Sequence, residues 1–546
     1  YNLEDGKVVK TELEKDNIFQ EQERKNVISQ NFSMPNLKEG SVYELSYTLT
    51  SPFLFNLPHW AFQRGIPTEL SELWVSMPEY FNYKTLMKGF LGLTERETKS
   101  TIGRFGDLQH DELFTRYVVR DAPAFREEPY MNSVKNYYSQ IDFELESYYF
   151  PGNLVEDLSS SWEKINTELL EDEEFGLQYK RTNMFGQEVQ LIKGTLESQK
   201  EQMIACVDLV KKRMTWDNYN SLYTRKSILK AWNDKTGNAA EINLALVALL
   251  REMGFEANPV ILSTRNHGMI HPGQILLSAF NYVIAQVKIG EETFLLDATD
   301  KDLNYTLLPQ RCLNGQGRLI SDIASNTSWV DINPSQKSET TTLVELKILP
   351  NGNMTGTISS GETNYMAYNS RNKINSIGDN DKYASELETK TTGLVINSIT
   401  IENQKDITQP LNSKMEVEFR LNDEQEKQTI IITPMLINQE KTNYFNRETR
   451  NFPVDFVFPF RKRYIHNFEI PEGYKVVETP KNIALSLPES LGMFRFNCAV
   501  NGSKIQITST FDINKAIISP VHYQALREFY SAMVSKHAEV MVLEKL

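Results

Sequence analysis

The sequence has few cysteines, no long apolar run and no excess of basic residues. Its three cysteines, Cys206, Cys312 and Cys498, are too few and too scattered for a disulfide framework or a zinc cluster, and they leave the redox compartment open. No stretch reaches the apolar length that spans a bilayer. The formal net charge of −14 offers no basic patch for a phosphate backbone. These absences predict a chain without a transmembrane segment and without a nucleic-acid partner.

The first residues also lack the features of an export signal. The stretch YNLEDGKVVKTELEKDNIF has no initiating methionine, no basic start and no apolar core. It is instead typical of the middle of a β-rich domain. We therefore expect that the chain is truncated at Tyr1, and the sequence leaves open what precedes that residue.

Length and composition predict a multidomain α+β protein. At 546 residues with 40% hydrophobic side chains, about three domains are expected, since one domain takes roughly 150 residues. We place a β-rich sheet or sandwich domain at 1–150, a helical lead-in and central domain at 151–335, and a C-terminal antiparallel β domain at 336–546 that is sandwich-like and ends in a helix. The boundaries follow from Pro151-Gly152, where strands give way to helices, and from the polar segment Ser335–Thr340.

Alternation of apolar and polar residues predicts the N-terminal strands. It is present at Ser41–Leu49, Leu73–Met77 and Gln140–Tyr149. An aromatic cluster with several prolines lies between the first two and contains Phe53, Phe55, Trp60 and Phe62. Such a cluster could contact a sugar ring or a peptide, but a sheet edge blocked by proline and packed by aromatic rings is the favoured interpretation.

A buried helix and a hairpin form the most clearly patterned stretch of the chain. Asn238 can cap the helix, Ile242–Leu250 is apolar on nearly every face, and Gly254 suits a left-handed C-terminal cap. The strands predicted after this helix are Pro259–Thr264, Phe280–Ile289 and Thr293–Ala298. Gly290-Glu291 is typical of a two-residue turn that joins the last two strands.

Further helices and strands are predicted on both sides of this stretch. Amphipathic spacing predicts helices at Leu158–Glu171, Leu196–Met214, Tyr223–Asn233 and, at the end of the chain, near His522–Val542. Pro350–Asn353 carries an Asn-Gly hairpin signal between two strand-like runs. The other C-terminal strands predicted are Met415–Leu421, Gln428–Thr433, Phe456–Phe460 and Ile505–Ser509.

Three parts of the central stretch resemble the transglutaminase-like group of the papain superfamily. That family has a Gly-x-Cys turn that opens a buried helix, a His early in the next-but-one strand, and an Asp that ends the last strand. The matching positions are Gly237-Asn238-Ala239, Tyr282 and Leu296-Asp297-Ala298-Thr299. The resemblance implies the family's fold for about residues 190–330, with Ala in place of the catalytic Cys and Tyr in place of the His.

Those two replacements remove the family's chemistry. A methyl group at Ala239 cannot attack a carbonyl, and a phenol of pKa about 10 at Tyr282 is a poor base at neutral pH. Losing the nucleophile or the base of a triad costs on the order of a millionfold in turnover. We therefore predict that Ala239, Tyr282 and Asp297 are degenerate triad positions with no catalytic residue intact. The turn at Gly290-Glu291 would put Tyr282 and Asp297 on one face, close enough for a hydrogen bond.

The order of the domains resembles a family of exported bacterial proteins of unsettled function. That resemblance implies export to the periplasm or the cell surface. Three functions stay open: a non-catalytic protein that binds a peptide, protein or glycan partner through the degenerate cleft, a hydrolase or transglutaminase-like enzyme that uses unrecognised residues, and a glycan-binding β-sandwich protein. We favour the first.

No metal ion or other cofactor is predicted. His267 and His271 have the spacing of a helical metal pair, but Gly268 and Pro272-Gly273 favour a loop. Asp379-Asn380-Asp381 is rich in possible calcium ligands, but the Gly and terminal Glu of a calcium-binding loop are missing. We expect a solvated loop there. His267 could replace the missing base only beside a nucleophile, and the nucleophile position holds none.

Overall fold

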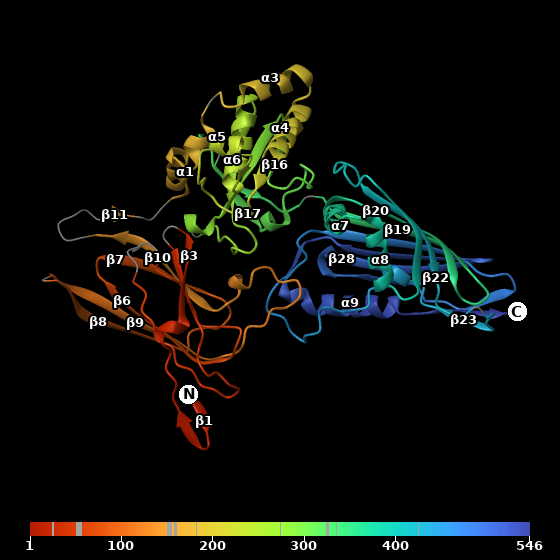
Figure 1. Cartoon of the computed structure of the whole chain (residues 1–546), viewed down its shortest axis with the longest axis horizontal. Helices are drawn as coiled ribbons and strands as arrows, with labels where there is room; N and C mark the ends of the chain where they lie inside the picture. The colour runs from red at the N-terminus through yellow and green to blue at the C-terminus, as the bar shows by residue number, and fades with distance from the viewer. Residues whose placement is uncertain are drawn as a thin grey trace. The chain divides into compact units, whose positions relative to one another are not determined.

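In a computed structural model of the protein, the chain divides into two compact units, Tyr1–Leu57 and Pro58–Leu546. The structure describes residues 1–24, 27–50, 57–106, 108–149, 156–157, 161–181, 183–273, 275–323, 327–334, 336–423 and 425–546. Strands predominate, and the helices occur in the middle of the chain and toward its C-terminal end (Figure 1). The protein is a multidomain α+β protein, as the sequence predicts. No helix in the described part is long and apolar enough to cross a membrane.

The first unit contains two small antiparallel pairs of strands. They join β1 (Asn2–Glu4) to β2 (Lys7–Val9), and β3 (Ile18–Arg24) to β4 (Val27–Phe32). The prediction of a strand at Ser41–Leu49 is wrong. These residues form no β-ladder with another segment, and their alternating apolar side chains are exposed. Alternation favours an extended segment, but a strand needs a neighbour that satisfies its backbone groups.

Two sheets follow in the N-terminal part of the second unit. Their strands are β5 Trp60–Ala61, β6 Thr68–Pro78, β7 Phe81–Lys88, β8 Glu95–Phe105, β9 Leu108–Ala122, β10 Gln140–Tyr148 and β11 Glu156–Asp157. One sheet has the order β6-β9-β8, and the other joins β5, β7 and β11 to β10. β6 and β10 confirm the strands predicted at Leu73–Met77 and Gln140–Tyr149.

The central part begins with helices that share one buried core. They are α1 Trp162–Glu171, α2 Gly176–Tyr179, α3 Gly186–Thr195, α4 Gln199–Arg213, α5 Ile228–Asp234 and α6 Ala239–Glu252 (yellow to green in Figure 1). α1, α4 and α5 confirm three predicted helices with shifted bounds. Leu158–Ser160 and Pro151-Gly152, used in those predictions, lie outside the described residues. Leu196, predicted to open the second helix, is instead the C-cap residue of α3.

A five-stranded sheet packs against α6. Its strands are β14 Glu256–Leu262, β15 Tyr282–Ile289, β16 Glu292–Leu296, β17 Gln316–Leu319 and β18 Trp329–Asp331. The order is β16-β15-β14-β17-β18, with every neighbouring pair antiparallel. The three predicted strands are present. β17 and β18 were not predicted, because each is short and β17 contains a glycine and two polar residues.

The C-terminal part is built on an eight-stranded sheet. Its strands are β19 Ser338–Ile348, β20 Met354–Glu362, β21 Leu394–Glu402, β22 Leu411–Phe419, β25 Phe460–Glu469, β27 Ile483–Ser486, β28 Gly492–Asn501 and β29 Lys504–Ile513. The order is β21-β22-β20-β19-β25-β29-β28-β27. β19 and β25 run parallel, so the domain is not purely antiparallel as predicted. The predicted hairpin at Pro350–Asn353 is confirmed, since Ile348 pairs with Met354.

One C-terminal strand was predicted in the wrong place. Residues 456–459 of the predicted strand Phe456–Phe460 are irregular, and β25 begins only at Phe460. Pro459 has no N–H to donate to a ladder, and Val457 has a φ of +72°, outside the strand region. The strands predicted around Met415 and Ile505 are confirmed by β22 and β29.

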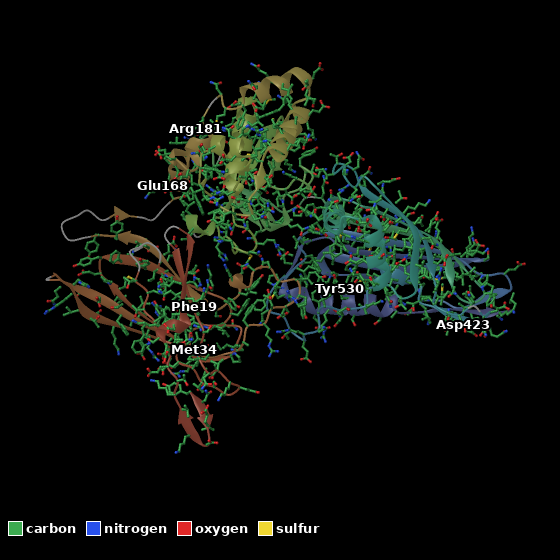
Figure 2. The ribbon with its side chains drawn as sticks, viewed as in Figure 1. Phe19, Met34, Glu168, Arg181, Asp423 and Tyr530 are labelled. Carbon is green, nitrogen blue, oxygen red and sulfur yellow. The ribbon has the colours of Figure 1, made fainter. Side chains whose placement is uncertain are left out.

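The terminal helix is present but shorter than predicted. α9 spans Tyr523–His537, and the chain then forms β31. The small sheet that follows has the order β23-β31-β26, with bounds Thr429–Ile432, Met541–Lys545 and Tyr474–Glu478. The apolar face of α9 is buried, and its Tyr530, labelled in Figure 2, lies edge-on to Phe511 of β29.

Two helices of the C-terminal part were not predicted. α7 (Asn364–Ile377) and α8 (Asn380–Lys390) are rich in polar residues, so their apolar faces are narrow. The solvated loop predicted at Asp379-Asn380-Asp381 is only partly present: Asp379 is exposed and precedes the helix, whereas Asn380 and Asp381 begin α8. The Asp379 side chain accepts a hydrogen bond from the Lys382 amide at 2.9 Å and caps α8.

All three C-terminal helices lie on one face of the eight-stranded sheet. Thr342, Tyr464 and Ser509 stand opposite one another on β19, β25 and β29, so their side chains share a face. α7 and α8 contact that face beside Thr342, and His537 of α9 lies 2.9 Å from the hydroxyl of Ser509. The sheet therefore has one face covered by helices, and this is the face on which the core of the domain lies.

Candidate functional site

The candidate site begins at the N-terminus of α6. Asn238 caps the helix by accepting from the Glu241 amide at 2.8 Å, and the Glu241 carboxylate accepts from the Asn238 amide at 2.8 Å. Glu241 is buried, and it also accepts from the amides of Arg225 and Lys226. These backbone donors at a helix N-terminus satisfy a carboxylate that would otherwise be costly to bury. The predicted cap is confirmed.

Ala239 is the first helical residue, and its side chain is fully buried. The next residues of α6 as far as Leu250 are also buried, as the apolar run predicts, and Gly254 has the left-handed φ of +92° that the C-terminal cap requires. The helix that presents the nucleophile position is therefore enclosed on every side over most of its length.

The hairpin of β15 and β16 brings the other two predicted positions together. Ile289 pairs with Glu292, so Gly290 and Glu291 form the predicted two-residue turn. In this register the hydroxyl of Tyr282 donates a 2.9 Å hydrogen bond to Oδ2 of Asp297. The predicted hydrogen bond is present, and both side chains are buried.

Asp297 is the centre of a closed polar network. Besides Tyr282, its carboxylate accepts from Nδ2 of Asn243 at 2.8 Å, from the Thr299 amide at 2.9 Å and from the Thr299 hydroxyl. Oδ1 of Asn243 in turn accepts from the Ala298 amide at 2.9 Å. Both carboxylate oxygens are therefore occupied by donors, which is what a buried acid requires.

Arg311 also hydrogen bonds to this network, and the sequence did not predict it as a site residue. Its Nη2 donates to the Tyr282 hydroxyl at 3.0 Å and to the Thr299 hydroxyl. Its guanidinium carbon lies 4.0 Å from the ring centroid of Trp216, a cation–π distance. The sequence around Arg311 has no periodicity and no motif, so only the tertiary fold reveals that this positive charge lies beside Asp297.

A short pair of strands positions Trp216 at the site. β12 (Thr215–Trp216) runs parallel to β13 (Thr236–Gly237), and Trp216 stands opposite Gly237, two residues before Ala239. Arg311 and Trp216 are partly exposed. With neighbouring residues they line a shallow hollow that includes Thr215, Thr299, Asp300, Lys301 and Asp302. The polar network therefore meets solvent at this hollow.

Burial shifts the pKa values of the groups in and beside this network. Burial and then the charge of Asp297 raise the pKa of Tyr282 well above its usual value, so the phenol stays neutral. Burial would lower the pKa of Arg311, but Tyr282 and Asp297 raise it above its usual value. Burial, with Asp297, also raises the pKa of Cys312, and a protonated buried thiol is inert.

The other residues singled out in the sequence lie elsewhere. His267 is in the loop between β14 and β15, and its Nε2 is 3.1 Å from the Ser278 carbonyl oxygen. Phe62 is buried in the N-terminal core, whereas Phe53 and Phe55 lie outside the described residues. Within the described chain, no three His, Cys, Asp or Glu side chains gather closely enough to hold a metal ion.

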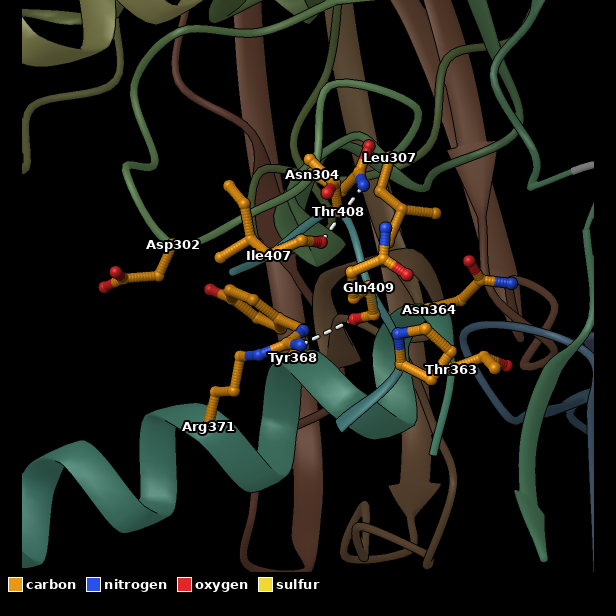
Figure 3. A pocket seen from close by; sticks show the side chains of 11 residues that line it. Asp302, Asn304, Leu307, Thr363, Asn364, Tyr368, Arg371, Ile407, Thr408 and Gln409 are labelled. Carbon is orange, nitrogen blue, oxygen red and sulfur yellow. Dashed lines mark hydrogen bonds between the residues drawn. The ribbon is translucent and has the colours of Figure 1, made fainter. Parts of the chain in front are cut away.

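A second hollow lies between residues 302–307 and α7 (Figure 3). Arg371 projects toward it, but its guanidinium donates to the backbone carbonyls of Asn403, Asp406 and Gln409. Asn304 likewise donates to the Ile407 carbonyl at 3.1 Å. These donors therefore hold residues 403–409 in place beside α7 and residues 302–307.

The comparisons with known proteins agree with this geometry. Residues 188–298 match the model of the transglutaminase-like superfamily, and residues 428–543 match a domain of unknown function, DUF3858. The chain therefore contains a transglutaminase-like domain, as the sequence resemblance implies. No curated protein matches the sequence.

Two solved structures were found to be similar. A proposed protease from Parabacteroides distasonis ATCC 8503 is 11% identical with a TM-score of 0.51, and the match covers 89% of this chain and 74% of that one. This likeness supports the fold. A proposed cysteine protease from Cytophaga hutchinsonii is 10% identical, and its match covers 50% of this chain and 90% of that one. At a TM-score of 0.20, the second carries no argument about this protein.

Proposed function

We propose that the transglutaminase-like domain is catalytically inert and binds a peptide, protein or glycan partner at the remains of its cleft. The observation that carries this proposal is Ala239, a buried methyl group at the helix start where the resemblance puts the nucleophile. The neighbouring hydroxyl and thiol groups do not replace the missing nucleophile. The hydroxyl of Tyr282 donates to Asp297, and the thiol of Cys312 is buried with a raised pKa.

The hollow beside Trp216 and Arg311 supports the binding half of the proposal. A partly exposed indole next to a guanidinium and the carboxylates of Asp300 and Asp302 combines an apolar face with hydrogen-bonding groups. Such a surface suits a sugar ring or an extended peptide. The partner would contact the rim of the site while the buried network stays intact.

Hydrolysis is the alternative function. The protein from Parabacteroides distasonis is described as a proposed protease, and it resembles this chain in its fold. A hydrolase would need a nucleophile outside the positions of Ala239 and Tyr282. It therefore stands second to the binding proposal.

We also propose that the protein is exported to the periplasm or the cell surface, as the resemblance of its domain order implies. Fractionation of cells that produce the full-length protein tests this. Recovery in the periplasmic or surface fraction is expected, and recovery in the cytosol alone would contradict export.

Binding at the hollow can be tested with a peptide library and a glycan array probed with the purified protein. Trp216→Ala is expected to weaken capture at least tenfold, because it removes the apolar face of the hollow. Trp74→Ala, which removes an exposed indole on β6, is the matched control and should leave capture unchanged. Absence of any specific ligand in both screens, or capture that survives Trp216→Ala, would contradict the proposal.

A further inference from the structure

The C-terminal domain contains a hollow of about 300 Å³ between its sheet and its helices. It lies on the helix-covered face, where strands β19 to β22 and β25 face α7 and α8. Cavities of this size are at the lower end of the range that holds small organic ligands. The hollow is separate from the polar network around Asp297, and the proposed function does not use it.

One wall of the hollow is apolar. α7 contributes Met366 and Ile374, α8 contributes Leu387, and Ile399 and Met415 come from β21 and β22. Aliphatic and thioether side chains offer no hydrogen bonds and adapt to the shape of an apolar guest. This wall therefore suits a hydrocarbon chain or ring.

A row of hydroxyl groups crosses adjacent strands of the same sheet and also lines the hollow. Ser413 pairs with Ser360, Ser360 with Thr342, and Thr342 with Tyr464. All four line the hollow. The next row along these strands, Met415, Ile358 and Val344, is apolar. A hydroxyl row in a sheet core is costly unless the hydroxyls find partners.

The protein itself satisfies only part of this row. The Thr342 and Ser360 hydroxyls lie 3.4 Å apart, at the limit of a hydrogen bond. Tyr464 is only 7% exposed, and it lines the hollow together with Ser413, on the far side of this pair. The hydroxyl groups of Tyr464 and Ser413 are therefore placed where they can hydrogen bond with a guest.

The charged groups at the edge of the hollow already have partners within the protein. Lys462 pairs with Glu440 at 2.8 Å. Burial raises the pKa of Glu362, whose carboxyl also accepts from the Thr340 hydroxyl at 3.4 Å. An anionic ligand would find the positive charge of Lys462 already paired, and the apolar surroundings penalise any charged ligand, so the chemistry favours a neutral guest.

We propose that this hollow binds a small neutral amphiphile, with an aliphatic or aromatic body of about ten to fifteen non-hydrogen atoms and a single hydroxyl or carbonyl head. The body lies against the methionine and aliphatic wall. The head hydrogen bonds with the hydroxyls of Tyr464 and Ser413. The C-terminal domain would then be a small-molecule binding domain attached to the transglutaminase-like domain.

Binding can be measured with the full chain and N-phenyl-1-naphthylamine, whose fluorescence rises in apolar sites. Primary alcohols from butanol upward should displace this probe. Their affinity should rise about fourfold for each added methylene group until the hollow is full, and then level off. Absence of saturable probe binding, or affinity that keeps rising through hexadecanol, would overturn the proposal.

A matched pair of variants locates the site. Ser360→Phe fills the hollow and should weaken probe and alcohol binding at least tenfold. Ser359→Phe places the same ring on the opposite face of β20 and should change binding less than twofold. Equal binding by both variants would overturn the proposal.

Tyr464→Phe keeps the ring and removes one hydroxyl, so it tests the polar contact even if Ser360→Phe does not fold. Octanol affinity should fall about fivefold, the equivalent of one hydrogen bond, with probe affinity unchanged. Unchanged octanol affinity would overturn the assigned head-group contact.

Discussion

At the scale of single residues, Asp297 determines how the central site can respond to change. Its carboxylate is buried and accepts hydrogen bonds from the hydroxyl groups of Tyr282 and Thr299. Arg311 donates a hydrogen bond to each of these hydroxyl groups. Removal of any one member leaves a buried partner unsatisfied, which costs more than the net gain of a typical hydrogen bond.

Tyr282→Phe tests this network. The change keeps the ring but takes one donor from Asp297 and one acceptor from Arg311, so the free energy of unfolding should fall by about 1–3 kcal/mol. Urea unfolding followed by tryptophan fluorescence measures it. Tyr47→Phe, at an exposed position, should have almost no effect. Equal midpoints for Tyr282→Phe and the unmodified protein would contradict the network.

Ala239→Cys alone should not create an active enzyme. Tyr282, at the position of the family's base, is neutral and already donates to Asp297, so it cannot take the thiol proton. The introduced thiol is also buried, and we expect it to react with iodoacetamide more slowly than a free thiol. Rapid, selective alkylation at pH about 6 would show that the helix start still activates a thiol there.

At the scale of elements, local signals explain what the sequence could predict. The capped helix α6 and the hairpin at Gly290-Glu291 are specified by caps, periodicity and turn residues that lie close together in the chain. The strand predicted at Ser41–Leu49 failed because alternation does not supply a pairing partner. α7 was missed because most of its residues are polar and its apolar face becomes visible only against the sheet.

The capping box of α6 gives a second stability prediction. Asn238→Ala removes the bond to the Glu241 amide and the bond from Nδ2 to the Tyr223 carbonyl, and should cost about 1–2 kcal/mol. Ser198→Ala at the start of α4 is the control, because the Ser198 side chain makes no capping bond. A similar loss in both variants would contradict the role of the box.

Two buried histidines predict a pH dependence in the C-terminal domain. Burial lowers the pKa of His466 and His537 to about 4. Between that value and the usual pKa of about 6.5, the unfolded chain binds more protons than the folded chain. The free energy of unfolding should therefore fall as the pH drops from about 6.5 toward 4, by up to about 3 kcal/mol for each histidine.

His537→Gln should reduce this loss, and it also changes the contact with Ser509 at neutral pH. His59→Gln, at an exposed position, is the control and should leave the pH dependence unchanged. Urea midpoints at pH 7.5 and pH 5 measure the difference. A midpoint that does not change between these pH values in the unmodified protein would contradict the buried neutral state.

At the scale of the whole molecule, the class of the domains was predictable but part of the site was not. The positions of Ala239, Tyr282 and Asp297 follow from local motifs and from the register of one hairpin. Trp216 lies in a two-residue strand and Arg311 in a three-residue 3-10 helix, and both elements are too short to show a pattern in the sequence. Only packing brings the two side chains to the same place. The hydroxyl row in the C-terminal sheet also depends on register across several strands, which the sequence does not specify locally.

The most direct test of the inert-domain proposal is turnover by the purified full chain. Ammonia release from glutamine peptides, incorporation of an amine and cleavage of a mixed peptide library can be measured beside Asp297→Ala. We expect no turnover above the blank by either protein, because Ala239 supplies no nucleophile. Turnover by the unmodified chain that Asp297→Ala abolishes, with the fold retained, would contradict the proposal.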